Sequence, residues 1–286
     1  MIEVDFIDLL DRFNMALKKN STEIHEGEQK SASTGQGMIF EDHKKYIPGD
    51  DIRKMDWKAY ARTDEFYIKR FEQEKSLTLH ILVDRSSSMD YGEPNKFDHA
   101  AKLGLATAYM SSKTNDRFRM SVFSETVTDI SSARRNPNMG EMVDTLNSLR
   151  KTPESMIERC ITEYSARIEN KSVVIIISDF LTDVEEIESA LKRLKGSDVI
   201  LVNTLDESEI EPEMQGDKIL KDPESEKTIR TYLSKRTRKK YKDKMTEHTQ
   251  NIEETAQKYG ANYLMVSTGE EFFDSFTELW RLINQD

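Results

Sequence analysis

From about residue 77 onward, short runs rich in Val and Ile alternate with amphipathic helical patterns, and this alternation limits the fold more than any other feature of the sequence. The apolar runs, which we expect to be strands, are 77–84, 118–124, 172–179, 198–205 and 262–268. Most do not alternate with polar residues, so each strand should be buried on both faces. Such strands separated by helices predict an α/β fold with a doubly wound, mainly parallel sheet.

Residues 1–76 follow a different pattern. The first twenty residues carry apolar side chains at three-to-four spacing and predict an amphipathic helix, whereas 65–75 alternates apolar and charged residues as an edge strand does. We therefore expect an N-terminal helix and extension over 1–76 and the sheet domain over 77–286. A chain of 286 residues is long enough for one large domain with such an extension.

The charge balance argues against nucleic acid and anionic lipid as partners of the whole molecule. The 53 acidic residues outnumber the 42 basic ones and give a net charge of −11, which repels phosphate groups. The one basic concentration, residues 229–245, is most simply the solvated face of a helix. A contact between this face and an acidic partner surface is the functional alternative.

The single cysteine, Cys160, excludes an internal disulfide and a thiolate metal cage, and a lone thiol fits a reducing compartment. The N-terminus is acidic where a signal peptide would be basic, and no apolar run is long enough to cross a bilayer. We expect a cytoplasmic protein without a membrane span.

Small oxygen-bearing side chains follow two of the expected strands. Asp84, Ser86 and Ser88 form a D-x-S-x-S pattern after the first strand, and Asp179 ends the strand 172–179. Ligands of doubly wound sheets bind beyond the carboxyl ends of the strands, and carboxylate and hydroxyl oxygens suit Mg²⁺. So few negative charges would leave the ion able to attract an incoming carboxylate. The alternative for Asp84, Ser86 and Ser88 is a helix cap or an Asx or Ser turn.

The D-x-S-x-S run, with an aspartate some ninety residues later, resembles the metal-ion-dependent adhesion site of von Willebrand factor A domains. More of the chain is similar to the domain of unknown function 58 family, over roughly residues 33 to 268. The runs that carry this resemblance are, in order, 46–63, 67–74, 81–92, 120–127 and 203–211. The resemblance implies a von Willebrand A-like domain that binds Mg²⁺, or Mn²⁺ or Ca²⁺ in its place.

The resemblance also implies a second loop that contributes a threonine to the metal, within a glycine-containing run. Residues 150–161 lack both glycines. Ser155 aligns best with the threonine, because Ile157 and Ile161 then occupy the two apolar positions of the family, and Thr152 is the rival. An alternative role for Ser155 is a capping box with Glu158, three residues on.

The run 46–63 contains Asp50, Asp51, Asp56 and Arg62 within a dozen or so residues. We expect Asp50 to cap a short helix, arginine–carboxylate pairs to fix the extension, and Trp57 to be buried. A second metal or acid/base site at Asp50, Asp51 and Asp56 is the competing hypothesis. Nearby arginines lower carboxylate pKa values and favour salt bridges over such a site. A role of the run 46–63 in docking a partner is the third hypothesis.

These observations predict a non-enzymatic, metal-dependent protein-binding module. The metal ligands would be Asp84, Ser86, Ser88, Asp179 and Ser155, and the partner would supply an Asp or Glu. The resemblance implies a MoxR-type AAA+ ATPase as the partner, with a role in assembling or remodelling protein complexes. One alternative is a Mg²⁺-dependent phosphoester hydrolase that uses the same cleft, although the chain has no second Asp at D-x-D spacing from Asp84. The other is a structural scaffold with an empty site.

Overall fold

The computed structural model describes residues 2–3, 5–24, 38–47, 55–63, 65–73, 78–131, 138–149, 155–168, 172–212, 216–221 and 228–284. The chain forms two compact units, one of residues 1–19 together with 77–286 and one of residues 20–76. The candidate site lies entirely in the larger unit, which is described first.

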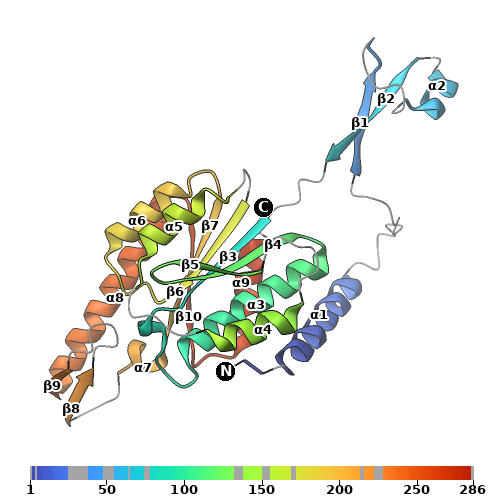
Figure 1. Cartoon of the computed structure of the whole chain (residues 1–286). Coiled ribbons are helices and arrows are strands. Elements are labelled where there is room, and N and C mark those ends of the chain that lie inside the picture. Colours follow the sequence, from blue (N-terminus) through green and yellow to red (C-terminus); the bar gives the residue numbers. More distant parts are fainter. Residues whose placement is uncertain are drawn as a thin grey trace. The chain divides into compact units, whose positions relative to one another are not determined.

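The larger unit is built around a six-stranded sheet in the order β10-β7-β6-β3-β4-β5 (Figure 1). All neighbouring strands are parallel except β5, which is antiparallel to β4 at one edge. The predicted doubly wound, mainly parallel sheet is therefore confirmed. The strands are β3 (Thr78–Asp84), β4 (Arg117–Phe123), β5 (Val127–Ser131), β6 (Ser172–Ser178), β7 (Asp198–Leu205) and β10 (Asn262–Ser267).

The strands β3 and β6 lie side by side in the centre of this sheet, with Val83 opposite Ile177. The chain leaves β3 toward β4 on one side and later returns to β6 on the other, so the strand order reverses between β3 and β6. Such a switch point opens a crevice beyond the carboxyl ends of the two strands. Asp84 ends β3 and Asp179 directly follows β6, so the two share one crevice.

Helices cover both faces of the sheet, with α3 and α4 on one side and α5, α6 and α8 on the other (Figure 1). Alternate residues of the central strands feed the two cores: Ile81 and Val83 join the first core, whereas Leu82 joins the second. Burial on both faces is the physical reason for the unbroken Val/Ile runs. The helices are α3 (Lys96–Thr114), α4 (Met139–Ser148), α5 (Ile157–Ser165), α6 (Val184–Arg193), α7 (Glu207–Ile210), α8 (Lys235–Lys258) and α9 (Phe272–Ile283).

The first helix, α1 (Asp5–Ile24), differs from the expected domain division, because its start belongs to the larger unit. Phe6 and Leu10 are buried in the core that α3 and α9 also line. The side chain of Asn147 on α4 hydrogen-bonds both the backbone N–H and the carbonyl of Ile2. The apolar stripe of α1 therefore covers the sheet unit.

The polar segment after β7 contains a hairpin that the sequence analysis did not expect. Strands β8 (Gly216–Lys221) and β9 (Thr228–Leu233) pair with each other and form a separate antiparallel sheet. The helical pattern assigned to 229–245 was therefore wrong in its first part, and α8 begins only at Lys235. The Ser234 hydroxyl caps α8 by accepting the backbone N–H of Thr237.

The smaller unit pairs β1 (Met38–Lys45) with β2 (Tyr67–Gln73) in an antiparallel hairpin and adds the short helix α2 (Trp57–Thr63). Asp56 starts this helix by accepting the backbone N–H of Ala59 at 3.1 Å. Asp50, the expected cap, and Asp51 lie outside the described residues. The expected burial of Trp57 was wrong, since its side chain is 61% exposed. Arg62 at the end of α2 is exposed as well.

Candidate metal centre

Asp84 is the last residue of β3, and its carboxylate is fully buried. One oxygen, Oδ1, accepts the backbone N–H of Ser86 at 2.8 Å, which turns the chain at the end of the strand. This Asx-type turn is the alternative that the sequence left open for the D-x-S-x-S run. The turn uses only Oδ1 of Asp84, so Oδ2 is available for other contacts.

The other oxygen of Asp84, Oδ2, accepts hydroxyl hydrogen bonds from two further segments. Ser155 donates to it at 2.9 Å and Ser178, at the end of β6, donates at 2.7 Å. The capping-box role of Ser155 is wrong, because α5 begins at Ile157 with Met156 as its N-cap residue. The Ser155 hydroxyl therefore lies at the crevice beside Asp84. Its rival Thr152 lies outside the described residues.

Ser86 and Ser88 lie in the turn that follows Asp84, around the short 3-10 helix η2 (Ser87–Met89). Both are buried, and their hydroxyl oxygens are 3.0 Å apart. Side chains two residues apart in this turn thus point to the same place. The first loop brings one carboxylate and two adjacent hydroxyls to the crevice.

Asp179 follows β6 and forms a buried salt bridge that the sequence analysis missed. The Lys96 ammonium lies 2.9 Å from its Oδ2 and 2.8 Å from Oε1 of Glu209 on α7. Burial lowers the pKa of Lys96, but the charges of Asp179 and Glu209 outweigh it and raise that pKa above its ordinary value. A lysine at the first position of a helix is unfavourable to the helix dipole, and this was the signal available in the sequence.

Glu209 also ties α7 to the crevice. Its other oxygen accepts the backbone N–H of Asp206 at 2.9 Å, within a capping box at the start of α7. Burial raises the pKa of Glu209 above its ordinary value, although Lys96 acts in the opposite direction. The run D-E-S-E at 206–209 matches a capping box, but no local pattern indicated that Glu209 would reach Lys96.

The electrostatic environment of Asp84 disfavours its charged form. Burial, and then the negative charge of Asp179, raise the pKa of Asp84 to about 6, although hydrogen bonds from Ser86, Ser178 and Ser155 act in the opposite direction. Among the described residues, no ammonium or guanidinium group pairs with Asp84. Lys96 neutralises Asp179, but no described cationic side chain does the same for Asp84.

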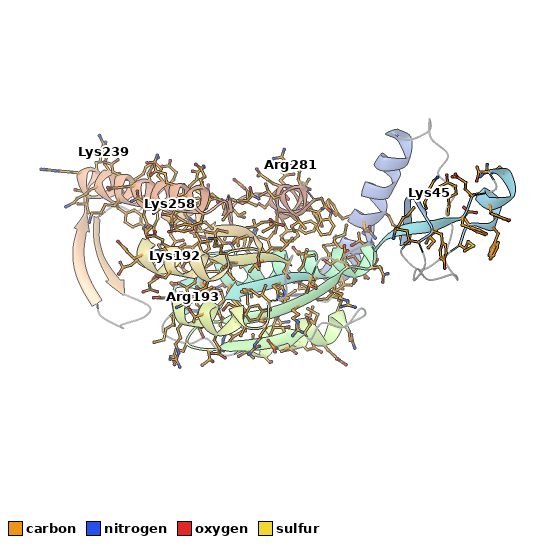
Figure 2. All side chains as sticks on the ribbon, turned by 90° about the horizontal axis from the view of Figure 1, so that it is seen from above. Lys45, Lys192, Arg193, Lys239, Lys258 and Arg281 are labelled. Carbon is orange, nitrogen blue, oxygen red and sulfur yellow. The ribbon has the colours of Figure 1, made fainter. Side chains whose placement is uncertain are left out.

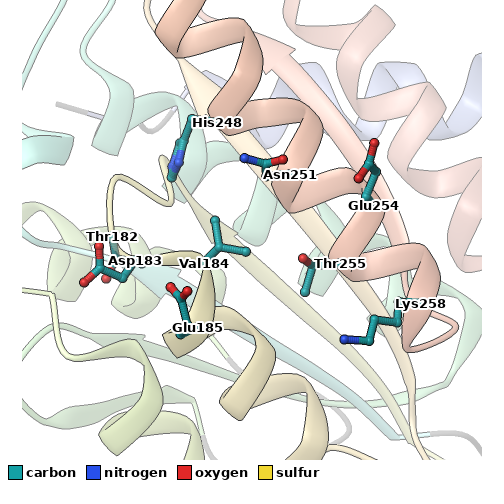
Figure 3. Close-up of a pocket in the computed structure, with 9 residues that line it drawn as sticks. All are labelled: Thr182, Asp183, Val184, Glu185, His248, Asn251, Glu254, Thr255 and Lys258. Carbon is teal, nitrogen blue, oxygen red and sulfur yellow. The ribbon is translucent and has the colours of Figure 1, made fainter.

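The loop after Asp179 is fixed by its own hydrogen bonds and by α8. Phe180 is buried with a φ of 48°, and its carbonyl accepts the ring N–H of His248 at 2.8 Å. Beyond this loop, a polar groove of about 630 Å³ runs between the start of α6 and α8 (Figure 3). Asp183 and Glu185 line one side, and Glu254 and Lys258 line the other.

All five residues proposed from sequence as metal ligands therefore lie at this crevice. The set contains two carboxylates and three hydroxyls. Among the described residues, no group of three or more His, Cys, Asp or Glu side chains could hold a metal, so a centre here would depend on the serine hydroxyls. Asp56 in the smaller unit is a helix cap, as described above, which accounts for it without a second metal site.

Residues 42–251 match the profile of the family described as "Protein of unknown function DUF58". The chain belongs to this family. The resemblance read from the five sequence runs is confirmed. The DUF58 protein is 22% identical over 269 residues to the uncharacterized protein Rv1480 of Mycobacterium tuberculosis, covering 92% of this chain and 85% of the relative.

Solved structures similar to the DUF58 protein include the SpRpn10 VWA domain, which matches 72% of this chain and 96% of its own, at 11% identity and a TM-score of 0.44. The conserved hypothetical protein BatB of Bacteroides thetaiotaomicron matches 73% of this chain and 100% of its own, at 16% identity and a TM-score of 0.45. Proximal thread matrix protein 1 of the mussel byssus, described with a zinc-occupied MIDAS motif, matches 73% of this chain and 47% of its own, at 13% identity and a TM-score of 0.41. Among the described residues, no helix has the length and apolar character needed to span a bilayer.

Proposed function

We propose that this DUF58 protein is a binding module, not an enzyme, and that it captures a carboxylate of a partner protein through a divalent metal ion. The observation that carries the proposal is the convergence on Asp84, a fully buried carboxylate. Hydroxyl groups of Ser155 and Ser178, from two other segments of the chain, donate to its Oδ2. Oxygen donors from separate turns are thereby gathered at the switch point of the sheet.

The donor set fits a hard divalent ion. Asp84, Ser86, Ser88, Ser155 and Asp179 would hold it, and all of them offer oxygen, the ligand that Mg²⁺ prefers. Asp84 is buried and repelled by Asp179, with no cationic side chain of the described residues to offset its charge. A buried carboxylate in this position gains from a bound cation. Mn²⁺ and Ca²⁺ take the same oxygen donors, so both are alternatives.

A bound ion would supply the positive charge that a partner's Asp or Glu seeks as a ligand. The two carboxylates and three hydroxyls of the centre are too few to provide six ligands, so an outside oxygen must complete the coordination. Lys96 also neutralises Asp179. That neutralisation leaves the centre less negative and so favours an incoming carboxylate. Burial of the loops also limits how far dissolved salt screens the charge of the ion.

The wider setting of this function remains the one implied by the family resemblance. We propose a MoxR-type AAA+ ATPase as the partner class and assembly or remodelling of protein complexes as the process. The free thiol of Cys160 is buried, and burial raises its pKa to about 11, so it is an inert core residue that suits the proposed cytoplasmic location.

Calorimetric titration of the chain with Mg²⁺ and Mn²⁺ tests the metal centre. We expect saturable binding by the wild type and none by Asp84→Ala, with Asp98→Ala, a carboxylate of α3, as the matched control that binds normally. A pull-down in Mg²⁺, repeated with EDTA, tests capture of a partner. Equal metal binding by wild type and Asp84→Ala would reject the proposal, and a partner retained in EDTA would favour the scaffold. Mg²⁺-dependent phosphatase activity that Asp84→Ala abolishes would favour the hydrolase.

A further inference from the structure

Three exposed apolar side chains surround the candidate metal centre. Tyr91 follows the D-x-S-x-S turn, Leu181 lies two residues after Asp179, and Tyr241 is on α8; their exposed fractions are 41%, 43% and 42%. The Tyr91 hydroxyl is 3.1 Å from that of Ser208 on α7, which holds this ring at the rim. Large apolar side chains gathered at a rim are typical of an interaction site.

Leu181 and Tyr241 line a common hollow of about 510 Å³, together with Met245 and His248 of α8. The hydrogen bond from His248 to the carbonyl of Phe180 fixes α8 against the loop that carries Asp179. The hollow shares Thr182, Asp183 and His248 with the polar groove of Figure 3. A partner whose carboxylate reaches the metal could therefore place an apolar side chain here.

The first part of α8 gives this surface its charge. Between 235 and 244 the helix has one acidic residue, Asp243, and seven basic ones: Lys235, Arg236, Arg238, Lys239, Lys240, Lys242 and Lys244. Lys242 pairs with Glu211. Lys239, Lys240 and Lys244 are exposed and form no ion pair with any residue that the structure describes. Lys244 also lines the hollow.

Lys244 brings the end of this basic part to the hollow, whereas Lys239 and Lys240 lie nearer the start of α8. In Figure 1, α8 starts beside the β8–β9 hairpin at the end of the sheet where α7 lies, and it runs back along α6. Figure 2 shows Lys239 and Lys258 near opposite ends of α8. A positive patch on a chain of net charge −11 attracts acidic groups locally while the rest of the surface repels them.

The rim of the centre beside α7 is acidic, and only one of the acidic residues described next, Glu211, pairs with a lysine of α8. Glu93, Glu207 and Glu211 line a neighbouring hollow of about 360 Å³ beside α7. A partner segment with several carboxylates would be repelled by α7 and attracted by α8. Its acidic residues would therefore lie toward α8 only.

We propose that the partner presents an acidic protein segment: one Asp or Glu for the metal, an apolar side chain for the hollow, and further carboxylates for Lys239, Lys240 and Lys244. This inference rests on the proposed function, since the metal fixes the first carboxylate. Tyr91, Leu181 and Tyr241 supply apolar contact area, and the lysines select acidic sequences. The surface thus determines which carboxylates are captured.

Selection of random 12-residue peptides displayed on phage, with the full chain, Mg²⁺ binding buffer and elution by EDTA, tests this inference. We expect enrichment of peptides that combine an Asp or Glu, an apolar residue and further acidic residues. With the variant Lys239→Glu/Lys240→Glu/Lys244→Glu, the additional acidic residues should no longer be enriched. A peptide selected on the wild type should bind this variant at least tenfold more weakly and lose most of its salt dependence.

The matched control is Arg193→Glu/Lys195→Glu/Arg281→Glu, which makes the same change in net charge. These exposed residues lie at the ends of α6 and α9, toward the amino ends of the strands, and Figure 2 labels two of them. This control should bind the selected peptide as the wild type does. Both triple variants should bind Mg²⁺ normally in calorimetry, because neither changes a residue of the metal centre.

The outcomes separate the inference from the proposed function. Absence of Mg²⁺ binding by the wild type rejects the proposed function itself. With Mg²⁺ binding intact, the inference alone is overturned by equal peptide affinity in wild type and α8 variant, or by selected peptides without additional acidic residues. If no peptide is eluted by EDTA, carboxylate capture by the metal is rejected as well. The inference is likewise overturned if a single-stranded oligonucleotide of twelve nucleotides binds more tightly than the selected peptide.

Discussion

The ammonium of Lys96 lies 2.9 Å from Oδ2 of Asp179, and their side chains are only 0% and 2% exposed. This salt bridge distinguishes the two carboxylates that meet where the strand order reverses. Asp179 has a cationic partner, whereas Asp84 accepts hydrogen bonds from Ser86, Ser155 and Ser178. The protein thus neutralises one carboxylate of the candidate metal centre with its own lysine, whereas the other has no cationic partner among the described residues.

Replacement of Lys96 by Met should lower the free energy of unfolding by about 3–5 kcal/mol, because it leaves the carboxylates of Asp179 and Glu209 buried without their cation. Urea unfolding at pH 7 measures the change. The control is Lys113→Met, which removes a half-exposed ion pair with Asp11 and should cost about 0–1 kcal/mol. Similar losses of unfolding free energy in both variants would show that the buried salt bridge of Lys96 contributes no more than the half-exposed ion pair of Lys113.

Replacement of Asp84 by Asn should have opposite effects with and without metal. In EDTA the variant should be more stable than the wild type by about 1–3 kcal/mol, because it removes a charge that burial and Asp179 disfavour. At Mg²⁺ a hundredfold above its Kd, the wild type should gain about 2.7 kcal/mol and the variant nothing. Thermal unfolding with EDTA and with Mg²⁺ measures both. A variant that Mg²⁺ stabilises as much as the wild type would contradict the assignment of Asp84.

Replacement of Ser155 by Ala should weaken Mg²⁺ binding by about tenfold and lower the free energy of unfolding of the metal-free protein by about 1–3 kcal/mol, because the buried Asp84 carboxylate loses a hydroxyl donor. Ser155 does not cap α5, so the helix loses no end contact. Ser165→Ala, at the other end of the same helix, is the control for calorimetry and unfolding. Unchanged Mg²⁺ affinity in Ser155→Ala would leave Thr152 as the second-loop candidate.

The buried His80 should make stability fall as the solution is acidified. Burial, and then the positive charge of Arg119, lower the pKa of His80 from 6.5 to about 4, so the unfolded chain binds a proton more readily than the folded one between those values. Stability from this residue is full above pH 6.5 and is lost as pH falls toward 4. His80→Gln should therefore lose about 2 kcal/mol less than the wild type between pH 7 and pH 5.

Urea titrations of wild type and His80→Gln at both pH values give this difference directly. The Tyr164 hydroxyl, 2.9 Å from Nδ1 of His80, can bond the Gln amide, so the variant should fold. Parallel pH dependence in the two proteins would show that His80 does not titrate on unfolding.

Much of the fold was predictable because it follows from local pattern. The runs that form β3, β6 and β7 are mostly apolar at successive positions. Successive residues point to opposite faces of a sheet, so both faces must be covered by helices. The hairpin β8–β9 was missed because its strands, GDKILK and TIRTYL, lack the continuous Val/Ile run that marks the central strands and lie in a polar segment. Trp57 was misplaced because an aromatic side chain in a short polar run does not reveal whether a surface covers it.

The sequence by itself determined that Asp84, Ser86, Ser88 and Asp179 follow two buried strands, since residue order and apolar period depend only on neighbours along the chain. Tertiary structure alone decided that Ser155 reaches Asp84 and that Lys96 bridges Asp179 to Glu209. Those contacts join residues 71, 83 and 113 positions apart. Which distant polar groups meet depends on how the strands are ordered and how the helices pack, and a local pattern carries no information about either.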